Sequence, residues 1–90
     1  MKKTIITVLG KDRVGIIAAI CNFLADSNVN VLDLNQTIVD GYFNMIIIAD
    51  ASQSNKPFGE LSDGIAELGK SLGMQIKMQQ EDIFEAMHRI

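Results

Sequence analysis

The 90-residue sequence is poor in cysteine, histidine and proline, with one residue of each, and these shortages exclude several kinds of protein. Because Cys21 is the single cysteine, the chain cannot form an internal disulfide, and nothing ties its fold to an oxidising compartment. No C-x-x-C, H-x-x-x-H or EF-hand-type motif occurs, which excludes the usual metal sites and soft-metal chaperones. Pro57 and seven scattered glycines leave no visible linker. We therefore expect one domain without a metal or other cofactor.

Long apolar runs and an excess of basic charge are also missing. The longest apolar run is far shorter than the ~20 residues that a membrane-spanning helix needs, and no signal-peptide core follows Lys2 and Lys3. Eight basic residues stand against 11 acidic ones, which gives a net charge of -3. This is the wrong sign for a domain held by phosphate contacts. We therefore expect a soluble cytoplasmic protein that binds neither a membrane nor nucleic acid directly.

Hydrophobic residues make up 48% of the chain, and their spacing alternates between the period of a strand and that of a helix. The predicted strands are residues 3–9, 31–39, 42–50 and 74–79, and the predicted helices are residues 13–27, 58–72 and 81–90. Asp12 is the predicted N-cap of the first helix, because its carboxylate can accept from free backbone N–H groups. Asp40 and Gly41 predict a two-residue hairpin turn, and Gly73 predicts the end of the second helix.

The order β-α-β-β-α-β predicts an α+β, ferredoxin-like fold. Right-handed crossovers place both helices on one face of a four-stranded antiparallel sheet, and alternation over residues 74–79 predicts an edge strand. Residues 1–80 form the predicted domain, and residues 81–90 form a short C-terminal helical extension of it.

The strand predicted over residues 42–50 is apolar on both of its faces. Two helices cover only one face of the sheet, so the other face exposes an apolar patch that a soluble monomer seldom leaves bare. Either the terminal helix folds back over this patch or a second chain covers it, and we favour a homodimer.

The junction between the first strand and the first helix, residues 9–17 (Leu-Gly-Lys-Asp-Arg-Val-Gly-Ile-Ile), has the clearest chemistry. Its glycines lack the spacing of a dinucleotide fingerprint or a P-loop. The free N–H groups of a helix N-terminus can bind a carboxylate, and Asp12 beside them can bind an ammonium group. Together these groups suit a free α-amino acid. The alternative stays open that Asp12 merely caps the helix and that Gly15 permits close packing of helix and sheet.

These residues resemble the ACT domain family. The resemblance rests on residues 9–17, on Asn-Val-Asn-Val at 28–31 and on Asp-Gly-Tyr-Phe at 40–43, and it covers about residues 3–79. The ending over residues 81–90 is similar to that of small stand-alone bacterial and archaeal ACT proteins. Those proteins resemble the ACT halves of the glycine cleavage system transcriptional repressor. Val14 stands where the common ACT pattern has proline.

The resemblance implies a dimer that senses a small ligand, usually an amino acid, at an interface between ACT units. The implied ligand-binding residues come from the loop before the first helix and from the start of the second strand. They are Lys11, Asp12, Arg13, Val14, Gly15, Ile16, Asn28 and Asn30. ACT units usually regulate an attached enzyme or DNA-binding domain, so for this short chain we expect the signal to pass to a partner protein, which is compatible with transcriptional regulation.

Three functions compete at this point. The first is a non-catalytic regulatory module, a homodimer that binds a small amino acid and docks on a partner protein through the apolar sheet face and the terminal helix. The second is a protein–protein interaction module without a ligand. The third is an acylphosphatase-like enzyme in which Arg13 holds phosphate, although the longer loop of that family, which ends in Phe-Arg, is absent.

Overall fold

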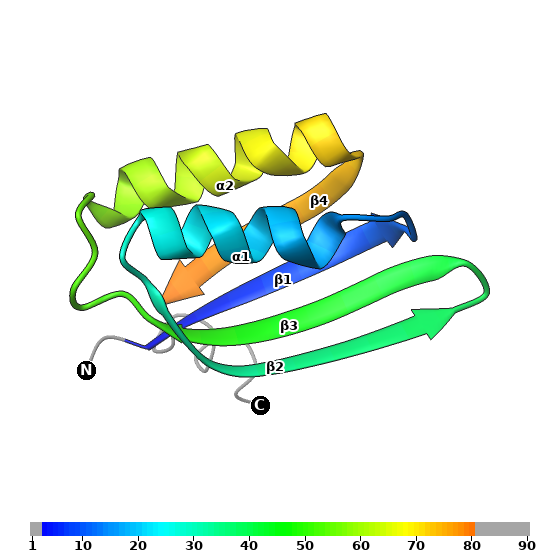
Figure 1. Ribbon diagram of the computed structural model, residues 1–90, viewed down its shortest axis with the longest axis horizontal. Coiled ribbons are helices and arrows are strands. Elements are labelled where there is room, and N and C mark those ends of the chain that lie inside the picture. The colour runs from blue at the N-terminus through cyan, green and yellow to red at the C-terminus, as the bar shows by residue number, and fades with distance from the viewer. Residues whose placement is uncertain (1–2, 81–90) are drawn as a thin grey trace, which may run out of the picture.

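A computed structural model describes residues 3–80 and contains six elements in the predicted order (Figure 1). The elements are β1 (Lys3–Lys11), α1 (Ile16–Asp26), β2 (Asn30–Val39), β3 (Tyr42–Asp50), α2 (Phe58–Leu72) and β4 (Met74–Gln80). The predicted helix over residues 81–90 lies outside the described residues.

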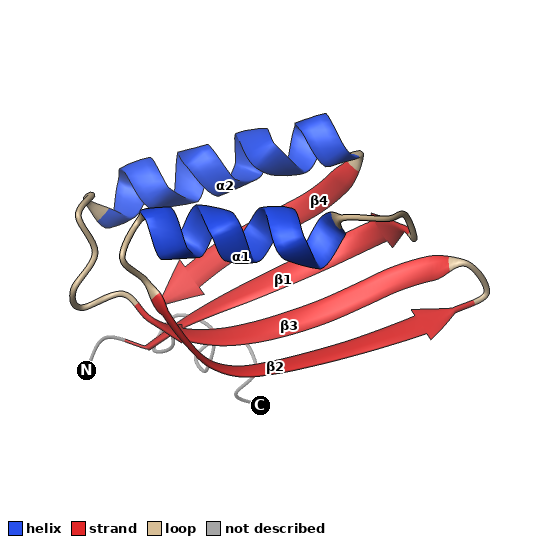
Figure 2. Cartoon of the chain, viewed as in Figure 1, coloured by secondary structure: helices blue, strands red, loops and turns tan. Residues whose placement is uncertain are grey.

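The four strands form one antiparallel sheet in the order β2-β3-β1-β4. Both helices lie on the same face of this sheet (Figure 2). The predicted ferredoxin-like fold is therefore confirmed, as is the edge position of β4. The second edge strand is β2.

Strand alternation sorts the apolar side chains between the two faces of the sheet. On the face toward the helices, which we call the inner face, β3 buries Phe43, Met45, Ile47 and Ala49. The apolar stripe of α1 packs on this face through Ile16, Ile20 and Leu24, as its helical spacing predicts. The other large buried residues of this core are Ile6, Val8, Val29, Leu61, Ile65, Met74, Ile76 and Met78.

The opposite face of the sheet, which we call the outer face, is also partly apolar. Tyr42 and Ile46 of β3 are 52% and 46% exposed there, and Leu9 of β1 is 49% exposed. Toward the other end of the same face, Ile48 is half-buried and Ile5 is buried. The prediction that β3 is apolar on both faces is confirmed.

The predicted start of the first helix is wrong by three residues. The helix begins at Ile16, and its N-cap is Gly15 rather than Asp12, with no capping hydrogen bond from a side chain. Gly15 has a φ of 91°, a left-handed conformation that interrupts helical geometry. The backbone N–H of Asp12 donates to the carbonyl of Gly41 at 3.0 Å, so the hairpin turn holds this residue in an extended loop.

The first strand runs two residues beyond its predicted end. Gly10 and Lys11 continue the ladder by pairing with Phe43 and Tyr42. A side chain at position 10 would be crowded by the start of β4. An added Cβ would lie 3.0 Å from the Gly73 backbone oxygen and closer still to the Met74 sulfur. Glycine therefore serves a close approach of β1 and β4 here and does not end the strand.

Two turn predictions are confirmed by backbone angles. Asp40 and Gly41 both have positive φ values, 52° and 80°, as a type I′ hairpin turn requires. Gly73 ends α2 in a left-handed conformation with a φ of 73°.

Candidate functional site

The loop between β1 and α1 forms one wall of a surface pocket of about 250 Å³, which we call the loop pocket. The first turn of α1 forms its floor, and β2 and β3 supply the opposite wall. The lining residues are Asp12, Arg13, Gly15, Ile16, Ile17, Ala18, Gln36, Ile38 and Phe43.

The residues that begin α1 line the loop pocket and carry backbone donors without a helical partner. Among the described residues, the N–H groups of Ile16, Ile17 and Ala18 have no hydrogen-bond acceptor. The first helical bond of the turn is made by Ala19, which donates to the Gly15 carbonyl at 3.0 Å. Donors left free at a helix N-terminus, together with the positive end of the helix dipole, bind a carboxylate or a similar small anion.

Asp12 lines the same pocket as these donors. Asp12 is exposed, and its side chain makes no hydrogen bond or ion pair within the part of the chain that the structure describes. Since it does not cap the helix, it is available for a cation. Amide donors next to a free carboxylate match the two charged groups of an α-amino acid.

Arg13 ties the loop to the second helix. Its Nη1 donates to the carbonyl oxygen of Leu72 at 3.1 Å, in the last turn of α2, where a cation is favoured. Arg13 is the single basic side chain lining the loop pocket, and it is held by this contact. The arrangement therefore favours fixing the loop over gripping a phosphate, which weakens the acylphosphatase alternative.

Two predicted loop residues do not line the loop pocket. Val14 is 97% exposed at the tip of the turn. Lys11 is paired with Tyr42 at the end of β1, which places it on the outer face, away from α1.

Asn28 and Asn30 lie at the other end of α1, in a separate surface pocket of about 440 Å³, which we call the turn pocket. The Nδ2 of Asn28 donates to the Gln53 carbonyl at 2.7 Å, and Asn30 is paired with Asp50. An 11-residue helix separates the two ends by about 16 Å. Within one chain, therefore, the structure does not bring the asparagines to the loop pocket.

The predicted ligand-binding residues omit five that line the loop pocket: Ile17 and Ala18 in the first turn of α1, and Gln36, Ile38 and Phe43 on the strands. The hairpin register pairs Ile38 with Phe43 and puts Gln36 on the same face two residues earlier. The Asp-Gly turn was the available signal, because a two-residue loop fixes this register.

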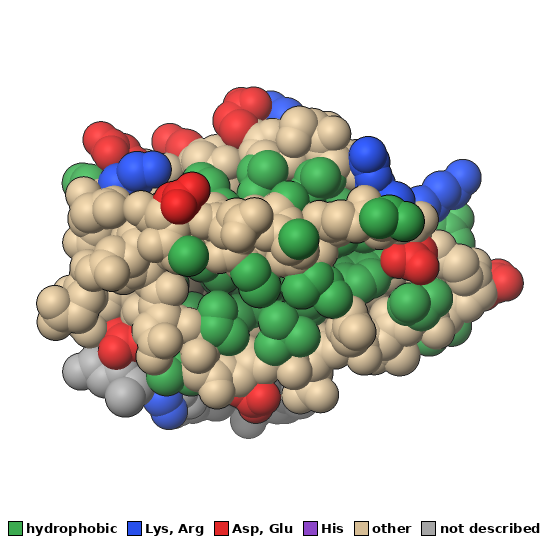
Figure 3. All heavy atoms as spheres, viewed as in Figure 1, with side chains coloured by type: hydrophobic (Ala, Val, Ile, Leu, Met, Phe, Trp, Pro, Cys, Tyr) green, Lys and Arg blue, Asp and Glu red, His purple; other side chains and the backbone are tan. Residues whose placement is uncertain are grey.

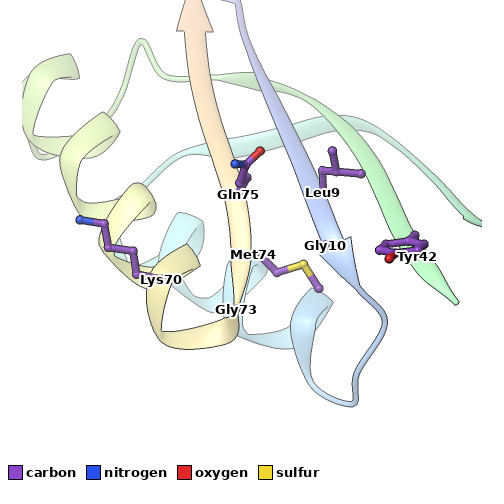
Figure 4. Close-up of a pocket in the computed structure, with 7 residues that line it drawn as sticks. All are labelled: Leu9, Gly10, Tyr42, Lys70, Gly73, Met74 and Gln75. Carbon is purple, nitrogen blue, oxygen red and sulfur yellow. The ribbon is translucent and has the colours of Figure 1, made fainter.

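A third pocket, of about 410 Å³, lies at the hairpin end of the outer face (Figure 4). Its wall is formed by Leu9 and Tyr42, and Met74 reaches toward Gly10 at its base. Lys70 points away from it, and its Nζ lies 3.5 Å from Glu67. This outer pocket is thus a mostly apolar hollow, and no acidic side chain lines it, unlike the loop pocket with Asp12.

Neither metal-binding nor membrane-spanning features occur in the described part of the chain. Between residues 3 and 80, no cluster of three His, Cys, Asp or Glu side chains could hold a metal ion. Neither α1 nor α2 is long and apolar enough to cross a membrane.

Comparison with known proteins decides the family. The family model described as "ACT domain" matches residues 2–79. The chain belongs to the ACT domain family. A UPF0237 protein of Bifidobacterium longum is 52% identical to this ACT chain over 90 residues, which is 100% of both chains.

Solved structures agree with this assignment. An ACT domain protein from Streptococcus pneumoniae superposes with a TM-score of 0.82 and 36% sequence identity, covering 93% of this chain and 94% of that one. A structure described as a candidate glycine cleavage system transcriptional repressor has a TM-score of 0.75 and 18% identity, over 88% of this chain and 45% of that one, and this likeness shows the fold alone. ACT domains are generally regulatory, ligand-binding modules.

Proposed function

We propose that this ACT protein is a non-catalytic regulatory module of the cytoplasm that binds a free amino acid in the loop pocket of a homodimer. The observation that carries the proposal is the set of three free amides, Ile16 to Ala18, beside the unpaired carboxylate of Asp12. The amides hold the ligand's α-carboxylate, Asp12 holds its ammonium group, and Ile38 with Phe43 faces its side chain.

The exposed edge of β2 supports the homodimer. No residue of β2 is buried, and Ile38 is 54% exposed on the inner face. Apolar side chains gather in the hollow between α1 and the strands β2 and β3 (Figure 3). Pairing this edge with the same edge of a second copy would satisfy its backbone groups and cover that hollow.

Such a dimer would also complete the site. In an antiparallel pairing of two β2 strands, the start of one strand lies beside the end of the other. Asn28 and Asn30 of the partner subunit then come next to Ile38 and the loop pocket. The asparagines that one chain keeps about 16 Å away are thereby supplied by the second chain, and their amides offer both donors and acceptors to the ligand.

The homodimer can be tested by a substitution at the middle of β2, where the two paired strands would cross the dimer axis. We expect the wild-type protein to sediment as a dimer, and Asn35→Glu to raise the dimer dissociation constant by roughly fivefold, because like charges meet across the paired strands. Asn44→Glu, the same substitution on the outer face of β3 away from the edge, is the matched control and should leave the dimer intact. A wild-type monomer in analytical ultracentrifugation would contradict the proposed dimer.

Ligand binding can be tested with a thermal-shift panel of the twenty amino acids at millimolar concentration. A ligand at a hundred times its Kd adds about 2.7 kcal/mol to the stability of the folded state. For a domain of this size, the melting temperature should then rise by roughly 10 °C or more. We expect one or two amino acids to produce this rise. A flat panel would contradict amino-acid sensing and favour the interaction module without a ligand.

The signal passes to a partner protein in this proposal, and the hairpin end of the outer face is the surface that supports such docking. Leu9, Tyr42 and Ile46 are each about half exposed there and lie together in the sheet register. An apolar patch of this kind usually marks an interaction site.

A further inference from the structure

The loop pocket and the outer pocket share no lining residue, yet the same short segments of the chain line both of them. Where β1 runs into the loop, Gly10 lines the outer pocket and Asp12 lines the loop pocket. In β3, Tyr42 lines the outer pocket, and the next residue, Phe43, lines the loop pocket. Successive side chains of a strand point to opposite faces of its sheet. A change in the position of either segment therefore reaches both pockets.

Arg13 adds a third link between the two pockets. Its side chain lines the loop pocket, and its Nη1 donates to the carbonyl oxygen of Leu72 at 3.1 Å. Leu72 ends α2, and the two residues after it, Gly73 and Met74, line the outer pocket. Figure 4 shows Met74 reaching toward Gly10 at the base of that pocket. One side chain of the loop pocket thus holds the backbone that continues into the wall of the outer pocket.

The loop over residues 12–15 is held by hydrogen bonds more than by packing. All four residues are exposed, and Val14 at the tip is 97% exposed. Within residues 3–80, two hydrogen bonds tie the loop to distant elements. They run from the Asp12 N–H to the Gly41 carbonyl and from the Arg13 side chain to the end of α2. A segment with so few buried contacts opens at low cost, so these two bonds decide how the loop sits.

We propose that Arg13 couples the two pockets: an amino acid in the loop pocket fixes the loop, and Arg13 transmits this order to the end of α2 and to the wall of the outer pocket. This coupling rests on the proposed function, since it takes the loop pocket as the ligand site. Arg13 acts as a positioning residue, through its contact with Leu72. A ligand that favours the fixed loop also favours the fixed form of the outer pocket. Ligand binding thereby changes the end of the outer face at which a partner protein is proposed to dock.

The ligand-free protein tests the hold of Arg13 on the end of α2. Tyr42 is the single tyrosine of a chain without tryptophan, so intrinsic fluorescence reports on the outer pocket. We expect Arg13→Ala to change the emission of Tyr42 and to shift the methyl signal of Met74. Arg13→Lys can still donate a hydrogen bond and should keep both signals close to those of the wild type. Lys56→Ala removes an exposed cation near the other end of α2 and should change neither signal. Unchanged Tyr42 and Met74 signals in Arg13→Ala would overturn the coupling.

The ligand's part is tested with the amino acid that gives the largest thermal shift. At saturation it should change the Tyr42 emission of the wild type, and Arg13→Ala should lose most of this response. If that amino acid is tyrosine or tryptophan, which fluoresce themselves, the Met74 methyl signal replaces the emission. In calorimetry, Arg13→Ala should also raise the Kd by about 2- to 30-fold, and Arg13→Lys should restore both affinity and response.

Two outcomes separate this coupling from the proposed function. Binding seen by calorimetry with no change at Tyr42 or Met74 would overturn the coupling and leave the proposed function standing. If no amino acid binds, the proposed function fails and the ligand's part of the coupling fails with it. The ligand-free comparison then shows separately whether Arg13 links the two pockets.

Discussion

Replacing Asp12 with alanine is expected to weaken amino-acid binding by about 10- to 100-fold. A hydrogen bond to a charged group contributes roughly 1.5–3 kcal/mol, and the Asp12 carboxylate is the single anionic group lining the loop pocket. Because this side chain makes no hydrogen bond or ion pair within residues 3–80, its loss should leave the fold intact. Isothermal titration calorimetry with the amino acid that gives the largest thermal shift measures the change.

Two further variants separate the role of the Asp12 carboxylate from net charge. Asp63→Ala removes an exposed carboxylate from α2, outside the loop pocket, and should bind the amino acid as the wild type does. Asp12→Asn keeps the shape of the side chain but should bind almost as weakly as Asp12→Ala. Wild-type affinity in both Asp12 variants would show that this residue does not hold the ligand's ammonium group.

The second large effect is expected at Gly69, where replacement by alanine should destabilise the fold by about 1–3 kcal/mol. Helix propensity alone predicts the opposite, a gain of up to about 1 kcal/mol. Gly69 is buried where α2 packs on β4, and an added Cβ would lie 2.8 Å from the Met74 oxygen and 2.9 Å from Cγ1 of Ile76. Urea denaturation gives the free energy of unfolding directly.

Gly59→Ala is the matched control for this prediction, because it lies in the same helix and an added Cβ there meets nothing within 4 Å. We expect this variant to be neutral or more stable than the wild type, by at most about 1 kcal/mol. If Gly69→Ala were as stable as Gly59→Ala, the close packing of α2 on β4 would be contradicted.

Most of the fold could be predicted because local signals agree with the final topology. The strand from Tyr42 to Asp50 was predicted to the residue, since β-branched alternation and the Asp-Gly turn point to the same boundaries. The apolar spacing of both helices likewise predicted which side chains face the sheet. Periodicity is strongest in elements that bury one face, and this small domain consists almost wholly of such elements.

The start of α1 could not be predicted for a tertiary reason. An aspartate just before an apolar periodic run is the usual sign of an N-cap, yet the backbone of Asp12 is bonded to Gly41 of the distant hairpin. The left-handed Gly15 then begins the helix three residues later. Because of this shift, the Asp12 carboxylate does not cap the helix.

The site was only partly visible in the sequence for a similar reason. Residues 12–16 are contiguous, so a motif reveals them, whereas Gln36 and Ile38 reach the loop pocket through the register of β2. The separation of Asn28 from the loop follows from the length of α1, which sequence similarity to a family does not convey.

Subunit complementation tests most directly whether the ligand site is shared between two chains. Asp12→Ala and the double variant Asn28→Gly with Asn30→Ala should each lose amino-acid binding as separate homodimers. Glycine is chosen at position 28 because Asn28 has a positive φ of 58°. When the two proteins are mixed and allowed to exchange subunits, each heterodimer holds one intact loop facing one intact pair of asparagines. We predict that the mixture regains part of the wild-type binding capacity. No recovery, in a mixture shown to contain heterodimers, would contradict a shared site.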